Sequence, residues 1–109
     1  MQYLCLIERF DNFFELDYRI LMLKIYYELA GTFAFNDLLL SFRKYIDRQT
    51  HLTENSEMSY YNFLKWSKFL FMQKAKKQAI EQAILEELKT INLLAERKWL
   101  LEKANIFFL

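Results

Sequence analysis

The near-absence of glycine and proline constrains this chain more than any other feature. Its 109 residues include one Gly, Gly31, and no Pro or Val, whereas average usage would give roughly a dozen Gly and Pro together. The turns of β-sheets depend on Gly, Pro, Asn and Asp at special backbone dihedrals, and strands favour β-branched residues. Leu, Glu and Lys, which dominate here, favour helices instead. The sequence therefore predicts an all-α fold.

The overall composition excludes several classes of protein. Hydrophobic residues make up 54% and aromatic residues 18% of the chain, so it can bury enough apolar surface to order itself. The net charge of +1 provides no global attraction to nucleic acid. No uncharged stretch exceeds about eight residues, whereas a membrane span needs roughly 20. The single Cys5 allows no internal disulfide, which fits a reducing compartment and a cytoplasmic location.

Hydrophobic periodicity predicts five or six helices, mostly packed as antiparallel neighbours. The chain from Ala79 to Phe107 is interpretable as one continuous helix or as two helices with a break at Thr90–Asn92. A polar loop over residues 49–57 separates the third predicted helix from the fourth. The predicted segments are Tyr3–Asn12, Leu16–Ala30, Phe33–Gln49, Glu57–Gln73, Ala79–Lys89 and Leu93–Phe107.

The second and third predicted helices differ in how their apolar residues are distributed. Over Leu16–Ala30 apolar residues occur nearly all the way round, which is typical of a helix buried on several sides. Gly31 follows it, where a left-handed cap residue is favoured. Thr32 is expected to cap the third helix, and Ser56 or Asn55 the fourth. The third helix has one apolar stripe at helical spacing, comprising Phe35, Leu38, Leu39, Phe42, Tyr45 and Ile46.

Both ends of the chain are apolar and lack capping residues, from Tyr3 at one end to Ile106–Leu109 at the other. The ends of a self-contained helical bundle are usually polar, whereas a helical repeat buries its open face on the next repeat. We therefore expect a single helical domain over residues 1–109 that forms the C-terminal piece of a longer helical-repeat protein.

The segment from Leu16 to Phe42 carries a family resemblance. Ile20, Leu23, Tyr27 and then Gly31, followed by a second amphipathic helix, resemble a tetratricopeptide-type helical hairpin. The stretches LDYRILMLKIYYELAGTFAFNDLLLSFRKYI and LAERKWLLEK resemble the C-terminal part of uncharacterised bacterial helical-repeat proteins. The resemblance covers roughly Leu16 to Lys103. It implies stacked helical hairpins in an α-solenoid fragment, and the proteins that the chain resembles have no established activity to carry over.

Residues that carry catalysis or bind metal are few. The only histidine, His51, falls in the polar loop and is interpreted as an exposed loop residue. One His and one Cys match no zinc-site spacing, and a chain with one Gly has no Gly-rich phosphate loop. Glu86 and Glu87 are adjacent and are interpreted as part of a solvated helix face. We therefore predict no enzyme activity, no cofactor and no metal site.

A basic stretch gives one alternative function. No acidic residue lies between Glu57 and Glu81, and the lysines of this interval, with Arg43, Lys44 and Arg48, would attract phosphates. Trp66, Tyr60 and Tyr61 would stack bases in such a site. A solvated helix face is the favoured interpretation, so nucleic acid is a less favoured partner. The lysines are Lys65, Lys68, Lys74, Lys76 and Lys77.

The excess of aromatic residues indicates the favoured function, a non-catalytic helical module for protein–protein interaction or scaffolding. Aromatic side chains beyond those needed for one buried stripe per helix are typical of interface anchors. The alternative is a helical bundle whose apolar excess is consumed by self-association. The candidate interaction residues are Tyr26, Phe71, Trp99, Phe107 and Phe108.

Overall fold

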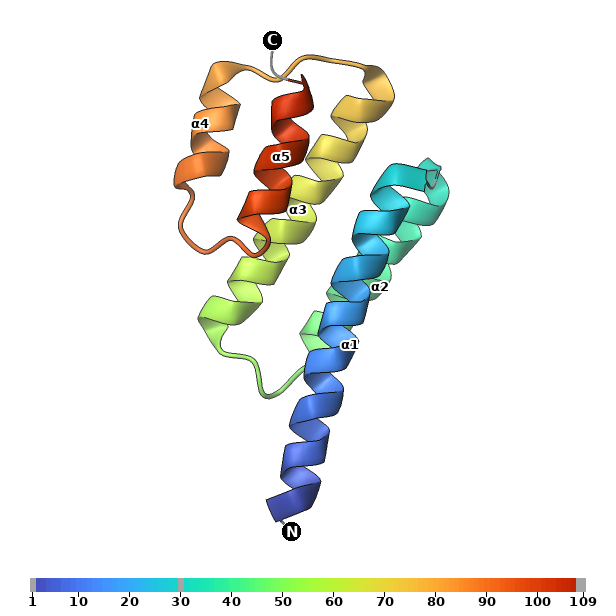
Figure 1. Ribbon diagram of the computed structural model, residues 1–109, viewed down its shortest axis with the longest axis vertical. Coiled ribbons are helices and arrows are strands. Elements are labelled where there is room, and N and C mark those ends of the chain that lie inside the picture. The colour runs from blue at the N-terminus through green and yellow to red at the C-terminus, as the bar shows by residue number, and fades with distance from the viewer. Residues whose placement is uncertain (1, 30, 108–109) are drawn as a thin grey trace. The chain divides into compact units, whose positions relative to one another are not determined.

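The fold is all-helical, as predicted (Figure 1). A computed structural model describes residues 2–29 and 31–107, with the side chains of residues 14–29 and 31–106. No strand occurs among these residues. The five helices are α1 (Gln2–Leu29), α2 (Thr32–Arg48), α3 (Glu54–Lys76), α4 (Gln82–Thr90) and α5 (Arg97–Phe107). The chain divides into two compact units, Met1–Leu38 and Leu39–Leu109, which are described separately; the single domain over residues 1–109 stays a prediction.

The first unit consists of α1 and the first turns of α2. Two helices were predicted in the region of α1, but nothing between Asn12 and Leu16 breaks a helix, and α1 is continuous. The prediction of a left-handed Gly31 is wrong, because Gly31 does not have a positive φ. Its carbonyl instead accepts the first hydrogen bond of α2, from Phe35 N at 3.1 Å. Thr32 therefore lies inside α2 rather than capping it.

The side chains of Tyr27 and Phe35 join the two helices of the first unit. Their rings meet edge to face with centroids 6.2 Å apart, a favoured aromatic geometry. Both residues are buried, with 2% and 0% of their surface exposed. The chain therefore turns back on itself between α1 and α2 and buries an aromatic pair beside the turn.

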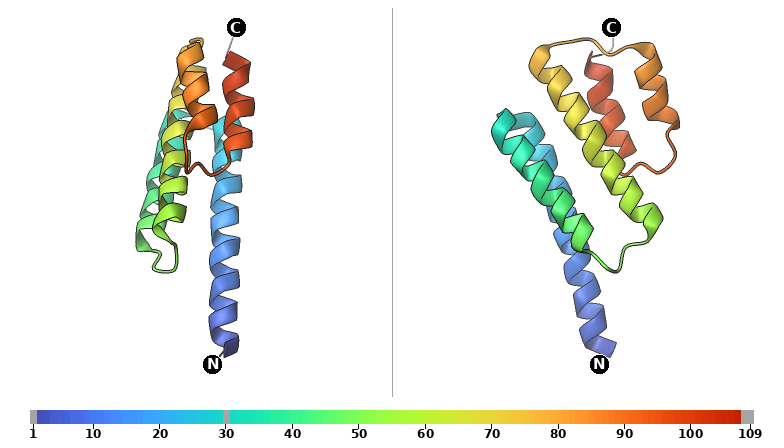
Figure 2. Two further views of the ribbon diagram at one scale, coloured as in Figure 1. Left: turned by 90° about the vertical axis from the view of Figure 1, so that its left-hand side faces the viewer. Right: turned by 180° about the vertical axis from the view of Figure 1, so that it is seen from behind.

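In the second unit, α3, α4 and α5 run up, down and up in the view of Figure 1. α5 contacts both α3 and α4, and the reverse view in Figure 2 shows the same order. α3 and α5 are therefore neighbours that run in the same direction, although mostly antiparallel neighbours were predicted. Phe63 of α3 has ring contacts with Phe42 of α2 at 6.4 Å and with Trp99 of α5 at 6.1 Å. These three rings connect three helices of this unit.

The ends of α3 are defined by two local motifs. Thr53 is the N-cap, and its hydroxyl oxygen accepts a hydrogen bond from Ser56 N at 3.1 Å, so the cap lies before the predicted Asn55 or Ser56. At the other end Lys77 adopts the left-handed conformation, with φ 54° and ψ 38°. Lys77 N donates to Lys74 O and Gln78 N to Gln73 O, which is the bonding pattern of a Schellman motif.

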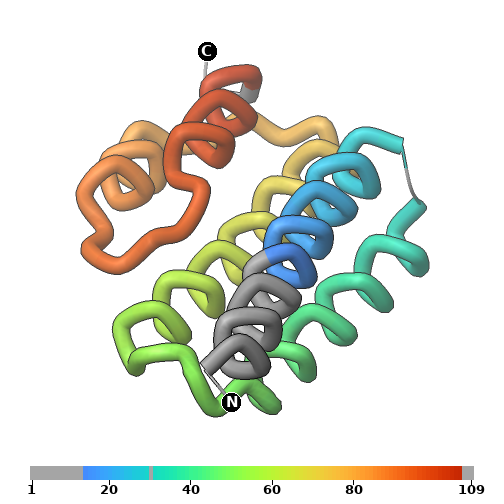
Figure 3. Tube along the Cα trace, turned by 60° about the horizontal axis from the view of Figure 1, so that its bottom comes forward, coloured from blue at the N-terminus to red at the C-terminus, as the bar shows by residue number. Residues whose placement is uncertain are grey.

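The segment from Ala79 to Phe107 is two helices, because α4 ends at Thr90 and α5 begins at Arg97 (Figure 3). The connection is longer than the predicted break at Thr90–Asn92. It is tied to α3 by Asn62 Nδ2, which donates to Leu93 O at 2.8 Å, and by Ala95 N, which donates to Ser59 O at 3.1 Å. The Arg97 guanidinium donates to the carbonyls of Lys89 and Ile91 at the end of α4.

None of the described helices combines the length and the apolar character that a membrane-spanning helix requires.

Candidate interaction surface

The most unusual surface of the described chain is an exposed line of large apolar side chains on α1. Between 40% and 83% of the surface of each is exposed. They are spaced four, three, four and four residues apart, and since successive helical residues are rotated by about 100°, this spacing places them along one side. We call this surface the α1 outer stripe; its members are Phe14, Tyr18, Leu21, Ile25 and Leu29.

The opposite side of α1 carries the buried residues Leu16, Leu23 and Tyr27, spaced seven and four residues apart. Leu21 and Leu23 show the contrast, since 55% of the surface of Leu21 is exposed and 0% of that of Leu23. Residues two positions apart in a helix are rotated by about 200°, so these two side chains point to opposite sides. The prediction that this helix is buried on several sides is therefore wrong for residues 14–29. It has one buried face and one exposed apolar face.

Charged residues border the α1 outer stripe. Asp17 and Lys24 lie seven residues apart and therefore on the same flank of the stripe. On the other flank, the Glu15 carboxylate accepts a hydrogen bond from Arg19 Nε at 3.0 Å. The stripe is thus an apolar band with Asp17, Lys24 and Glu28 along one border and an ion pair along the other.

The predicted aromatic anchors occupy different environments. Tyr26 is partly exposed on α1. Phe71 is buried, with 6% of its surface exposed, so it belongs to the core and offers no surface for a partner. Trp99 is partly exposed and lies between the Phe63 ring and the Lys103 ammonium, which is 5.9 Å from the indole centroid. Phe107 ends α5; its side chain and the whole of Phe108 are outside the described residues.

The predicted basic stretch does not form one surface. Lys65, Lys68 and Lys76 are exposed, and helical geometry places them on one side of α3. Lys74 lies on the opposite side, in line with the buried Phe63 and Leu70 and only partly exposed. Lys77 follows the end of the helix.

One aromatic ring of the predicted base-stacking set is engaged within the chain. The Tyr61 hydroxyl donates a hydrogen bond to Oδ1 of Asp47, and the Arg43 guanidinium lies 5.3 Å from the ring centroid. The hydrogen bond to Asp47, followed by burial and nearby negative charge, raises the pKa of Tyr61 to about 12. Arg43 and Tyr61 therefore interact with each other, which removes both from a preformed phosphate- and base-binding surface. Trp66, the second member of that set, is buried.

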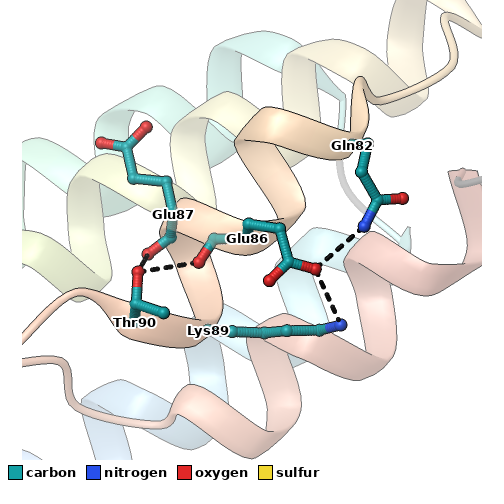
Figure 4. A network of polar contacts seen from close by, with 5 residues as sticks. All are labelled: Gln82, Glu86, Glu87, Lys89 and Thr90. Atoms are coloured by element: carbon teal, nitrogen blue, oxygen red, sulfur yellow. Dashed lines mark hydrogen bonds and ion pairs between the residues drawn. The ribbon is translucent and has the colours of Figure 1, made fainter.

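The remaining polar residues belong to exposed helix surfaces and loops. His51 is exposed in the connection between α2 and α3. Figure 4 shows the Glu86 carboxylate accepting hydrogen bonds from Gln82 Nε2 at 2.9 Å and Lys89 Nζ at 3.4 Å. The Thr90 hydroxyl donates to Glu86 O at 2.8 Å. This network joins residues of one helix, as the solvated-face interpretation of Glu86 predicted. Among the described side chains, no three His, Cys, Asp or Glu residues lie together as a metal site requires.

Sequence reasoning identified Tyr26 as a candidate interaction residue but missed the α1 outer stripe as a surface. The signal was present in the four-three-four spacing of Phe14, Tyr18, Leu21 and Ile25. This signal was hidden because the buried residues of α1 follow the same helical period on the opposite side. Together the two apolar sets surround the helix.

Comparison with known proteins found no match among the models of protein families, the curated proteins or the solved structures.

Proposed function

We propose that this chain is a non-catalytic helical module that binds other proteins through apolar helix faces. The α1 outer stripe is the observation that carries the proposal. Single exposed apolar residues are common on protein surfaces, whereas a contiguous exposed apolar patch is typical of an interaction site. Helix-in-groove binding and helix pairing both use anchors at this spacing.

The arrangement of helices supports a tetratricopeptide-like hairpin as the structural unit of this module. α1 turns back into α2 after a two-residue interval and buries the Tyr27–Phe35 pair beside the turn. In the second unit, α5 packs beside α3 in the same direction, as the first helices of successive hairpins do when hairpins stack. A cytoplasmic location fits a protein whose only cysteine has no internal partner.

A nucleic-acid-binding function has less support. Lys65, Lys68 and Lys76 share one side of α3, but Lys74 lies on the opposite side. Three exposed lysines form a short phosphate contact at most. We therefore retain protein binding as the proposed function.

Site-specific photo-crosslinking tests the proposal. A photoreactive phenylalanine analogue placed at Leu21, which is exposed on the α1 outer stripe, is expected to form protein adducts in the cell of origin. The same analogue placed at Asp37, an exposed position on α2, is the matched control and should give several-fold fewer adducts. Equal adduct yields at the two positions would contradict the proposed function, and the mass of each adduct identifies what was bound.

A further inference from the structure

We propose that the α1 outer stripe binds a second copy of this chain, with the two α1 helices packed antiparallel. This inference rests on the proposed function and names its partner. It follows from the spacing of the stripe, from the charges along one border and from the area that the stripe exposes.

The spacing of the stripe is symmetric about a point between Tyr18 and Leu21. A two-fold axis through that point would place Phe14 beside Ile25 of the second copy, and Tyr18 beside Leu21 of the second copy. Each aromatic side chain would then pack against a smaller aliphatic one, which fills the space between two helices better than rings facing rings. The axis forms each of these pairs twice.

The charges along the border favour the antiparallel orientation. In an antiparallel pair, Asp17 of one copy comes opposite Lys24 of the other, and the symmetry forms this pair at two places. On the other border, Glu15 comes opposite Met22. A parallel pair would instead place Asp17 opposite Met22 and Lys24 opposite Leu29, with no pairing of charge. The pairing of Asp17 with Lys24 therefore favours an antiparallel copy over a parallel one.

The exposed area fits a weak dimer. A large side chain presents about 150–250 Å² when it is fully exposed, so the stripe exposes on the order of 500 Å² per copy. Two copies would bury about 1,000 Å², which lies near the lower limit of specific interfaces. We therefore expect a dimer whose population rises with concentration.

Sedimentation analysis of the full chain over a concentration series is the first test. The wild-type chain should pass from monomer to dimer, and Leu21→Glu should remain monomeric at every concentration. Leu40→Glu is the matched control, because Leu40 is an equally exposed leucine (54%) on another helix, α2, and it should dimerise like the wild type. Circular dichroism and thermal melting should show both variants folded, since the two positions are exposed. A wild-type chain that stays monomeric, or a Leu21→Glu variant that dimerises, would overturn the inference.

Charge reversal tests the antiparallel orientation. Asp17→Lys places two lysines opposite each other at both places, and Lys24→Asp places two aspartates there, so each variant alone should dimerise about tenfold more weakly. An equimolar mixture of the two variants restores opposite charges at both places and should dimerise like the wild type. A mixture no stronger than either variant alone would exclude the antiparallel pairing.

The two proposals fail separately. Crosslinked adducts at Leu21 that contain only a different protein, with a monomeric wild-type chain, would leave the interaction function intact and remove the second copy as the partner. The opposite result is that Leu21 gives no more adducts than Asp37, while the chain forms a stripe-dependent dimer at high concentration. That result would exclude an interaction in the cell and leave the self-association intact.

Discussion

The two longest helices, α1 and α3, differ in what they place opposite their buried faces. Both bury residues along one side: Leu16, Leu23 and Tyr27 on α1, and six residues from Phe63 to Phe71 on α3. The far side of α3 carries Lys65, Lys68 and Lys76, with Met58 and Met72 among them. The far side of α1 carries the five large apolar residues of the α1 outer stripe.

This difference separates the two tasks of an amphipathic helix. Charged residues on the outer face keep a helix in water and raise the cost of any partner that would cover them, because covering them removes their hydration. An apolar outer face gains free energy when a partner covers it. The outer face of α3 is thus suited to contact with water, whereas α1 has a second face that is suited to packing against a partner.

The largest effect is expected at the inner face of α3. Phe63→Ala should lower the free energy of unfolding by about 3–5 kcal/mol, because a fully buried aromatic ring is lost and a cavity remains. Lys65→Ala, two residues away on the exposed side, should change it by less than about 0.5 kcal/mol. Urea unfolding followed by circular dichroism measures both. Similar losses in the two variants would mean that α3 does not have distinct inner and outer faces.

The same contrast on α1 uses two leucines. Leu23→Ala should cost about 2–5 kcal/mol, since Leu23 is fully buried. Leu21→Ala should cost less than about 0.5 kcal/mol when measured at a concentration where the chain is monomeric. The two variants delete the same atoms at positions two residues apart on one helix, so their difference reports burial. If Leu21→Ala is as destabilising as Leu23→Ala in the monomer, the α1 outer stripe is part of a core. The proposed difference between the outer faces of α1 and α3 would then be wrong.

These two leucines also show how far the sequence predicts this fold. The absence of Pro, the single Gly and the helical spacing were sufficient for an all-α chain, and the stripe through Phe35, Phe42 and Ile46 was found on α2 as predicted. Spacing alone could not assign the inner face of α1, because two apolar sets with the same period lie on opposite sides. Only the positions of the neighbouring helices decide which set is buried.

A smaller effect is expected at the end of α3. Lys77 holds the left-handed conformation of a Schellman motif, which costs a side-chain-bearing residue about 1 kcal/mol relative to glycine. Lys77→Gly should therefore raise the free energy of unfolding by about 0.5–1 kcal/mol. Lys76→Gly, the control one residue earlier inside the helix, should lower it by about 1 kcal/mol. A destabilised Lys77→Gly variant would contradict the left-handed cap.

Helix ends were predicted less well than helices, and the reason is visible at two caps. Gly31 was expected in the left-handed conformation because glycine adopts it without strain, yet that conformation occurs at Lys77. The hydrogen bonds of the Schellman motif at Lys77 are made by backbone atoms and leave no sign in the residue type. The candidate site shows the same limit: Phe71 and Trp99 were both predicted from the sequence as candidate anchors, but the fold buries the first and leaves the second partly exposed.

The smallest effect distinguishes two tyrosines whose pKa is raised to about 12, one on each of the long helices. On α1, burial is the main cause for Tyr27, with the nearby Glu28 adding to it. On α3, the hydrogen bond to Asp47 is the main cause for Tyr61. For each tyrosine, the folded-state pKa lies above the unfolded value of about 10. Its contribution to the free energy of unfolding is therefore complete below pH 10 and is lost as the pH rises through 12.

A spectrophotometric titration of tyrosinate should therefore contain a component near pH 12 that Tyr61→Phe reduces. Asp47→Asn keeps a hydrogen-bond acceptor beside Tyr61 but removes the negative charge, so it should lower the pKa of Tyr61 and leave that of Tyr27 unchanged. The comparison of helices is sharpened if the two tyrosines respond separately. If Asp47→Asn shifts the entire late component, or none of it, the hydrogen bond does not have the role given to it at the surface of α3.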